Sequence, residues 1–122
     1  MKTTTLQLLP TTTYGTPSGN YDGSSQDFAG TQQKAADYYG GFGDLQTVAI
    51  FLLNFQGRLR IEATLASVPA SDAEWFRVED YNYTSSTTTT NFSTNITGNF
   101  TWIRASVEDF TAGTITKVML SY

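Results

Sequence analysis

The chain of 122 residues contains no cysteine and no histidine. Without cysteine there can be no disulfide and no thiolate ligand for a metal, which fits assembly in a reducing cytoplasm. Without histidine the chain lacks the commonest general base and the commonest ligand of zinc, copper and non-haem iron. We therefore expect no metal and no cofactor, and a fold held by apolar burial, which a chain of this length can supply.

Basic residues are also few, since seven of them face eleven acidic residues and the net charge is -4. Such a chain has no electrostatic footprint for nucleic acid or for an anionic membrane. No run approaches the ~20 apolar residues of a membrane helix. The leucines near the N-terminus are too few for a signal peptide. We expect neither a nucleic-acid partner nor a membrane, and no export.

Threonine and aromatic residues, by contrast, are abundant. Aromatic residues make up 14% of the chain, and threonine runs occupy residues 3–5, 11–13 and 87–90. Threonine is β-branched and suits a pleated surface that faces water. The composition predicts an all-β protein.

The pattern of apolar residues predicts individual strands. Residues 58–66 alternate strictly between apolar and polar side chains, as in a half-buried strand. Residues 47–55 are almost continuously apolar, which predicts a strand covered on both faces. Gln56-Gly57 and residues 108–113 are expected to be turns. Further strands are predicted at residues 3–9, 75–81, 91–96, 100–107 and 114–122, with residues 83–90 as a loop or edge.

Short strands separated by turn signals predict an antiparallel β-sandwich, jelly-roll-like, with little or no helix. Residues 1–122 then form a single domain, with a strand-rich core at 46–122 and a loop-rich region at 1–45. Within that region, residues 14–30 are rich in Gly, Ser, Asn and Asp and read as a long ordered loop or extended arm. Residues 34–39 are a short strand or helical turn. We expect residues 1–30 to contact other subunits.

No residue pattern predicts catalysis. Carboxylates could form a glycosidase pair, but they lie among arginines or at strand ends and are best interpreted as solvated charges. Asn20, Asp22 and Asp27 could offer oxygens to calcium, but an Asx-turn is the simpler interpretation of this loop. Gly40-Gly41-Phe42-Gly43 lacks the rest of a phosphate-binding loop. We therefore predict that the chain is not an enzyme; the carboxylates in question are Glu62, Glu74, Glu79, Asp80, Glu108 and Asp109.

Aromatic residues are the candidate contact residues. Tyr14, Tyr21, Tyr38, Trp75 and Trp102 could form an interface with another protein or a platform on which a sugar stacks. Burial in the core is a third use of the same side chains. The sequence leaves these uses open.

The second part of the chain resembles small structural proteins and modules of tailed-bacteriophage virions, those of marine and cyanobacterial myoviruses above all. The resemblance covers roughly residues 45–122, and the N-terminal region has no counterpart. The segments that carry it are Gly57-Arg-Leu-Arg-Ile-Glu-Ala-Thr-Leu-Ala66, Trp75-Phe-Arg-Val78, Gly98-Asn-Phe-Thr-Trp-Ile-Arg-Ala105 and Phe110-Thr-Ala-Gly-Thr-Ile-Thr-Lys-Val118.

This resemblance implies a β-sandwich module without a catalytic motif. It implies a non-enzymatic virion component: a capsid decoration or cement protein, or a tail, baseplate or fibre protein, assembled in the host cytoplasm. Its expected partners are other virion proteins, and a homo-oligomer is expected. The alternative is a carbohydrate-binding module that uses Trp75 or Trp102 and takes a host glycan as its ligand.

Overall fold

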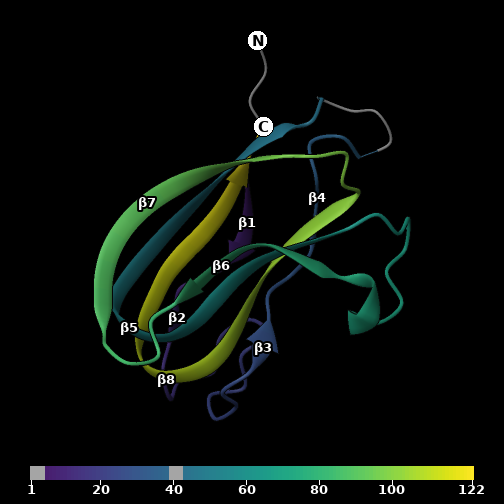
Figure 1. Cartoon of the computed structure of the whole chain (residues 1–122). Helices are drawn as coiled ribbons and strands as arrows, with labels where there is room; N and C mark the ends of the chain where they lie inside the picture. The colour runs from purple at the N-terminus through teal and green to yellow at the C-terminus, as the bar shows by residue number, and fades with distance from the viewer. Residues whose placement is uncertain (1–4, 39–42) are drawn as a thin grey trace.

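Two strands of twenty residues each, β5 and β8, pair with one another antiparallel along almost their whole length (Figure 1). This computed structural model describes residues 5–38 and 43–122. The strands are β1 (Thr5–Leu9), β2 (Thr12–Thr13), β3 (Phe28–Ala29), β4 (Gln33–Lys34), β5 (Leu45–Thr64), β6 (Phe76–Asn82), β7 (Thr88–Thr97) and β8 (Trp102–Ser121), and η1 (Asp72–Glu74) is a 3-10 turn.

The remaining strands line the two outer sides of this pair. β7 pairs with the first half of β5, and β6 pairs with its second half. On the far side of β8, the N-terminal strands β1, β2, β3 and β4 follow one another antiparallel to it. The eight strands of the described residues therefore all belong to one antiparallel sheet.

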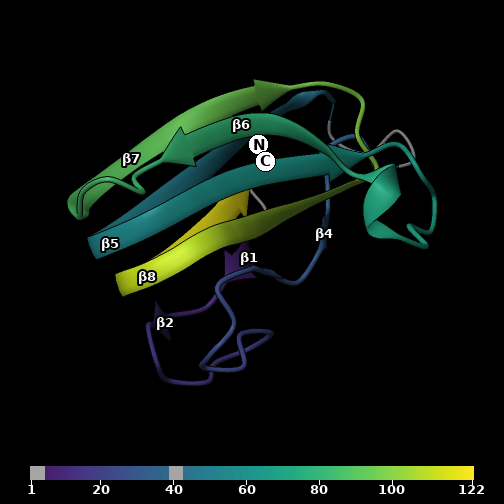
Figure 2. The ribbon, with the colours of Figure 1, turned by 60° about the horizontal axis from the view of Figure 1, so that its bottom comes forward.

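The sheet bends across its middle, so that its two halves face each other. Asn54 and Asp109 have φ angles of 52° and 53°, and the β5–β8 register shifts between Leu53 and Arg58. Such bulges bend strands and increase their twist. As a result β6 and β7 lie across from each other (Figure 2). The ring centres of Tyr81 and Phe92 are 4.9 Å apart.

The core fills the space inside the bend. Alternate residues of β5 point inward in both halves, and β8 contributes a matching row. Every second side chain of a strand faces the same side, so one buried face suffices to hold the sheet. The fully buried large side chains are Leu8, Leu9, Tyr21, Ile50, Leu52, Phe55, Leu59, Ile61, Ile103, Phe110, Ile115 and Leu120.

The prediction of an all-β, antiparallel, sandwich-like fold with almost no helix is confirmed. Two finer predictions are wrong. Gln56-Gly57 and residues 108–113 are bends inside β5 and β8, not turns between strands. Residues 47–55 are covered on one face, since Leu53 is 50% exposed and Phe51 half-buried. The reason is that bending one sheet buries only its inner face.

The N-terminal region is an integral part of the sheet. Leu8, Leu9 and Tyr21 from this region are buried in the core. The predicted strand at 3–9 is confirmed over Thr5–Leu9, and its first two residues lie outside the described part. A short strand or helical turn is expected at residues 34–39. The structure has strand β4 at Gln33–Lys34 and then a turn that includes Tyr38, and residue 39 lies outside the described part. The glycine-rich turn at 40–43 also falls mainly on undescribed residues.

Candidate binding surfaces

All four arginines of the chain lie on the outer surface of one half of the sheet, which we call the arginine face. The alternation of β5 turns Leu59 and Ile61 inward, so Arg58 and Arg60 point outward. Residues that pair across antiparallel strands share a face. Arg77 of β6 and Arg104 of β8 both pair with Glu62 and therefore lie on the same surface.

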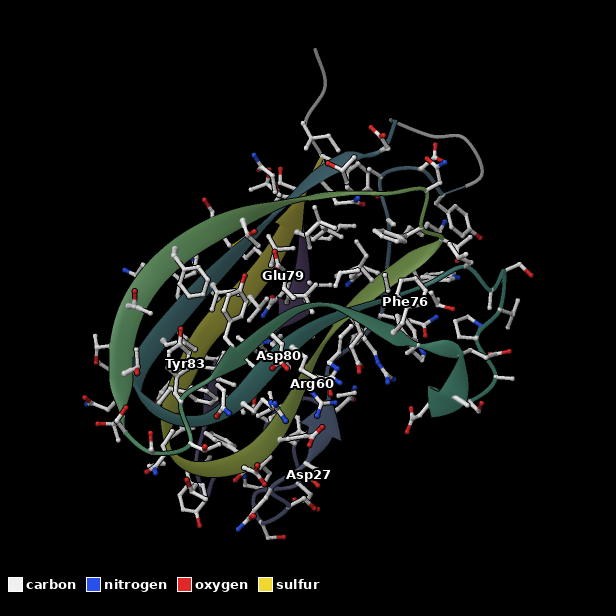
Figure 3. The ribbon with its side chains drawn as sticks, in the orientation of Figure 1. Asp27, Arg60, Phe76, Glu79, Asp80 and Tyr83 are labelled. Carbon is white, nitrogen blue, oxygen red and sulfur yellow. The ribbon has the colours of Figure 1, made fainter. Side chains whose placement is uncertain are left out.

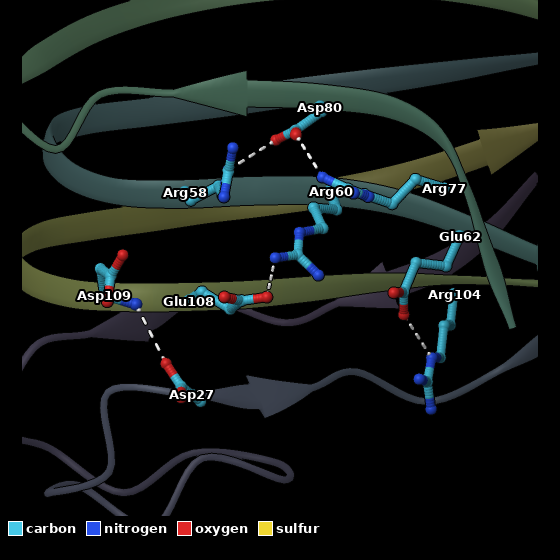
Figure 4. A network of polar contacts seen from close by, with 9 residues as sticks. All are labelled: Asp27, Arg58, Arg60, Glu62, Arg77, Asp80, Arg104, Glu108 and Asp109. Atoms are coloured by element: carbon cyan, nitrogen blue, oxygen red, sulfur yellow. Dashed lines mark hydrogen bonds and ion pairs between the residues drawn. The ribbon is translucent and has the colours of Figure 1, made fainter. Parts of the chain in front are cut away.

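Each arginine on this face has a carboxylate partner (Figure 4). Asp80 accepts a hydrogen bond from Arg58 Nε at 3.1 Å, which links β5 to β6, and another from Arg77 Nη1 of its own strand at 2.9 Å. Arg60 pairs with Glu108 and links β5 to β8. The charges therefore compensate one another, and the arginine face has no unpaired positive patch for an anionic ligand.

Arg104 makes the most buried of these contacts. Its Nε lies 2.8 Å from Glu62 Oε1, its Nη1 lies 3.2 Å from Asp72 Oδ1, and its guanidinium carbon lies 4.4 Å from the centre of the Trp75 ring. Glu62 is only 7% exposed. Its interpretation as a solvated charge is therefore wrong, because Arg104 compensates the charge from a strand forty residues away in sequence.

Trp102 and Tyr38 lie beside Arg104 and Trp75, and these four residues form what we call the aromatic end of the arginine face. Trp102 alternates with Arg104 on the outer side of β8. Its Nε1 donates to the Ser67 carbonyl at 3.0 Å, and its ring meets that of Tyr38 edge-on at 5.1 Å. Three of the five predicted contact residues therefore gather in one place, each partly exposed.

Tyr14 and Tyr21 lie elsewhere. Tyr14 is 47% exposed and meets the edge of Phe110. Tyr21 is 2% exposed, packs against Phe28 and Phe110, and accepts a hydrogen bond from the Gly15 N–H at 2.9 Å. Tyr21 is thus a core residue, and its prediction as a contact residue is corrected. Nothing in the sequence separates it from Tyr14, because both lie in a loop.

Glu79 and Asp80 do not form the catalytic pair that adjacent carboxylates suggest. Glu79 pairs with the inward-facing Ile61, and Asp80 pairs with the outward-facing Arg60 (Figure 3). Glu79 accepts a hydrogen bond from Thr94 Oγ1 at 3.1 Å, on the inner side of the bent sheet between β6 and β7. Burial, and then the charge of Glu79, raise the pKa of Tyr81 above its usual value. A shallow pocket of about 250 Å³ lies along residues 77–80.

The loop with Asp22 forms the expected Asx-turn. Asp22 Oδ1 accepts the N–H groups of Ser24 and Ser25 at 2.9 and 2.7 Å, and its Oδ2 accepts the Ser25 hydroxyl at 2.7 Å. These hydrogen bonds, those to Ser25 first, lower the pKa of Asp22 to about 2. In the part of the chain that the structure describes, no group of three or more acidic side chains could hold a metal ion.

The feature that sequence reasoning missed is the free edge of β7. Within residues 5–38 and 43–122, β7 pairs with β5 on one side and has no strand on the other. It is ten residues long and contains no charged residue and no proline. The sequence signal was present, because residues 87–97 are a β-prone stretch without any charge. Residues 83–90 are expected to be a loop or edge, and the loop there ends at Thr88, where this edge strand begins.

The comparisons with known proteins add no family. No model of a protein family matches the chain, and no curated protein matches it either. Among the described residues, no helix is long and apolar enough to cross a membrane.

Proposed function

We propose that this chain is a non-enzymatic structural component of a phage virion that acts through protein–protein contacts. Its place is in the capsid, as a decoration or cement protein, or in the tail, baseplate or fibres. The observation that carries this proposal is the unprotected edge of β7. Isolated proteins guard their sheet edges with charges, prolines, bulges or covering loops, so a long, neutral edge is suited to assembly.

The arginine face supports the same role. Its four arginines are each engaged by a carboxylate of the same chain, and they tie β5, β6 and β8 together. Because a planar guanidinium presents several donors at once, such pairs cross-link neighbouring strands on the outer surface of a module. A rigid module that presents a free strand edge suits repeated assembly contacts better than turnover of a substrate.

The test is quantitative mass spectrometry of purified phage particles, giving copies of this chain per copy of the major capsid protein. Hundreds of copies per particle support a capsid decoration protein. Tens or fewer support a tail, baseplate or fibre protein. Complete absence from the particles would overturn the proposal.

A carbohydrate-binding module is the second candidate, and the aromatic end favours it. Trp75, Trp102 and Tyr38 lie together, with the carboxylate of Asp72 beside Arg104 as a polar group. Sugars stack on such rings and bond to such polar groups. Arg104 already contacts the Trp75 ring, and Tyr38 already contacts the Trp102 ring. These contacts reduce the ring surface on which a sugar could stack.

Titration of tryptophan fluorescence with bacterial surface oligosaccharides tests this candidate. Saturable quenching that Trp75→Ala or Trp102→Ala abolishes, and that the control Tyr14→Ala leaves intact, would support glycan binding at the aromatic end. Quenching that survives both tryptophan substitutions, or no quenching at all, would contradict it.

A further inference from the structure

We infer that the free edge of β7 pairs antiparallel with the β7 edge of a second copy of this chain, which extends the sheet across a two-fold axis. The inference rests on the assembly role proposed above and names the surface and the partner. Strand addition at an exposed edge is a common mode of recognition, in which backbone hydrogen bonds supply the affinity.

The hydrogen-bond pattern shows which groups of β7 are available. The Gly98 N–H donates to the Asp44 carbonyl at 3.0 Å, and the side-chain amide of Gln46 donates to the Ile96 carbonyl at 3.1 Å. Hydrogen-bonded pairs alternate along an antiparallel ladder, so the residues between them present their N–H and C=O groups to the opposite side. Thr97 is one of these residues at the end of β7, and toward the middle of the strand they are Asn91, Ser93 and Asn95.

These three residues offer no obstacle to a second strand. Their side chains are short, polar and exposed, and they lie on the outer surface of the sheet. The inner face of β7 holds Phe92, which is anchored by the Tyr81 ring, and Ile96, which is buried. The pairing with β5 and the packing of its inner face therefore hold β7 in an extended conformation. The backbone N–H and C=O groups on its outer edge are available to a second strand.

The other edges of the sheet are protected against the addition of a further strand. β6 carries Arg77, Glu79 and Asp80 within seven residues and has a register shift against β5. At the opposite margin the strands are short and interrupted, and the Gln33 side-chain amide donates to the Gln7 carbonyl at 3.0 Å. Charges, bulges and side-chain cover are the usual devices against strand addition. Among the described strands, β7 is the long edge without charges or side-chain cover, and its own register shift against β5 is confined to its first residues, between Thr88 and Thr90.

Charge decides in favour of a second copy over a different protein. A two-fold axis brings each residue near its own copy, so a charged edge would repel itself. β5, β6 and β8 all carry ionisable side chains, whereas β7 carries none. A different strand partner would need complementary charges or side-chain pockets for its selection, and β7 offers no charge. With the axis at Ser93, that residue faces its copy and Asn91 faces Asn95 of the second chain.

The decisive variant is Ser93→Lys in the full chain, followed by light scattering coupled to size-exclusion chromatography. We expect the wild type to be a dimer of the 13.4 kDa chain and Ser93→Lys to weaken association at least about tenfold. Thr116→Lys is the control, because it places the same charge at an exposed threonine of β8, a strand flanked by other strands on both sides, where Thr116 itself lies at a register shift against β5. Mixing Ser93→Lys with Ser93→Glu should restore a dimer.

Amide hydrogen exchange gives an independent result. The N–H groups of Asn91, Ser93 and Asn95 should be protected in the wild type and exchange freely in Ser93→Lys. A monomeric wild type, or a dimer that Ser93→Lys does not weaken, would overturn the inference. If the chain does not dimerise but is found in phage particles, the proposed function stands and only the β7 pairing is wrong. If the chain dimerises but is absent from particles, the pairing stands and the proposed function is wrong.

Discussion

Arg104 shows how a single side chain can join three segments that are distant in sequence. Its guanidinium donates along its edge to Glu62 of β5 and Asp72 of η1, while its flat face lies over Trp75. A planar guanidinium can do both at once, because its donors lie in the plane and its faces stay free to stack. A lysine at this position could not replace all three contacts.

Removing Arg104 should therefore cost more than an ordinary surface substitution. Arg104→Met leaves the buried Glu62 carboxylate without its partner, which should lower the free energy of unfolding by about 3–5 kcal/mol. The double variant Arg104→Met/Glu62→Leu should regain most of this loss, because no buried charge is then left unpaired and Asp72 is exposed. Urea denaturation measures both.

Arg77→Met is the matched control. Arg77 pairs with Asp80 but its side chain is 51% exposed, so this substitution should change stability by less than about 1 kcal/mol. Equal losses for Arg77→Met and Arg104→Met, or a double variant as unstable as Arg104→Met alone, would show that the burial of Glu62 has no energetic consequence.

The lowered pKa of Asp22 predicts that the stability of the fold depends on pH in the acidic range. Its pKa is lowered to about 2 by the hydrogen bonds from Ser25 first and Ser24 next. A carboxyl whose pKa is depressed by folding stabilises the folded state above the unfolded pKa, here 3.8, and loses this contribution as the pH falls toward 2. NMR titration of the Asp22 carboxyl should give a midpoint near 2 in the wild type. Ser25→Ala should raise that midpoint but keep it below 3.8, because the backbone donors remain; an unchanged midpoint would contradict the assignment.

At the level of the strands, the sequence predicts the buried faces well and the connections poorly. The alternation at residues 58–64 is sufficient to assign Leu59, Ile61 and Ala63 to the core. Gly57 and Gly113, by contrast, suggest turns, although β5 and β8 continue through them. Glycine and left-handed Asp or Asn serve turns and bends alike. The choice depends on long-range pairing, such as the Asp109 N–H on Asp27 at 3.1 Å, which no local pattern reveals.

Gly113 is the bend position most sensitive to substitution. Its φ is 89°, and a Cβ there would lie 2.0 Å from the Asn54 carbonyl oxygen, where β5 and β8 bend together. Gly113→Ala should cost about 1–2 kcal/mol for the left-handed backbone and about 1–3 kcal/mol more for the clash. Thermal and urea unfolding would measure the loss.

Gly15→Ala separates the two causes. Gly15 has nearly the same φ, 86°, but a Cβ there would meet nothing within 4 Å. It should show the backbone cost alone. If Gly15→Ala were as destabilising as Gly113→Ala, the close approach of the two long strands at the bend would not matter.

On the scale of the whole molecule, the surfaces were predictable to different degrees. The sequence identifies Trp75, Trp102 and Tyr38 as contact candidates, because large aromatic residues are enriched at binding interfaces. It does not reveal that Arg104 joins them or that Glu62 is buried, because those contacts link segments about thirty to forty residues apart. The free edge of β7 depends on which strands pair with β5, and that is a property of the complete sheet.

The N-terminal region offers the last test, since it was expected to reach toward neighbouring subunits. In the folded chain it pairs along β8 from Thr5 to Lys34 and supplies Leu8, Leu9 and Tyr21 to the core. Three such side chains contribute about 5–9 kcal/mol by burial, which is comparable to the whole stability of a domain. To lie across a neighbour, this segment would first have to leave its own β8. We therefore expect a chain of residues 31–122 to lack cooperative urea unfolding, and a peptide of residues 5–30 added in trans to restore it. A truncated chain that unfolds cooperatively near the wild-type midpoint would instead show that residues 31–122 fold by themselves and that residues 1–30 are free to contact a neighbour.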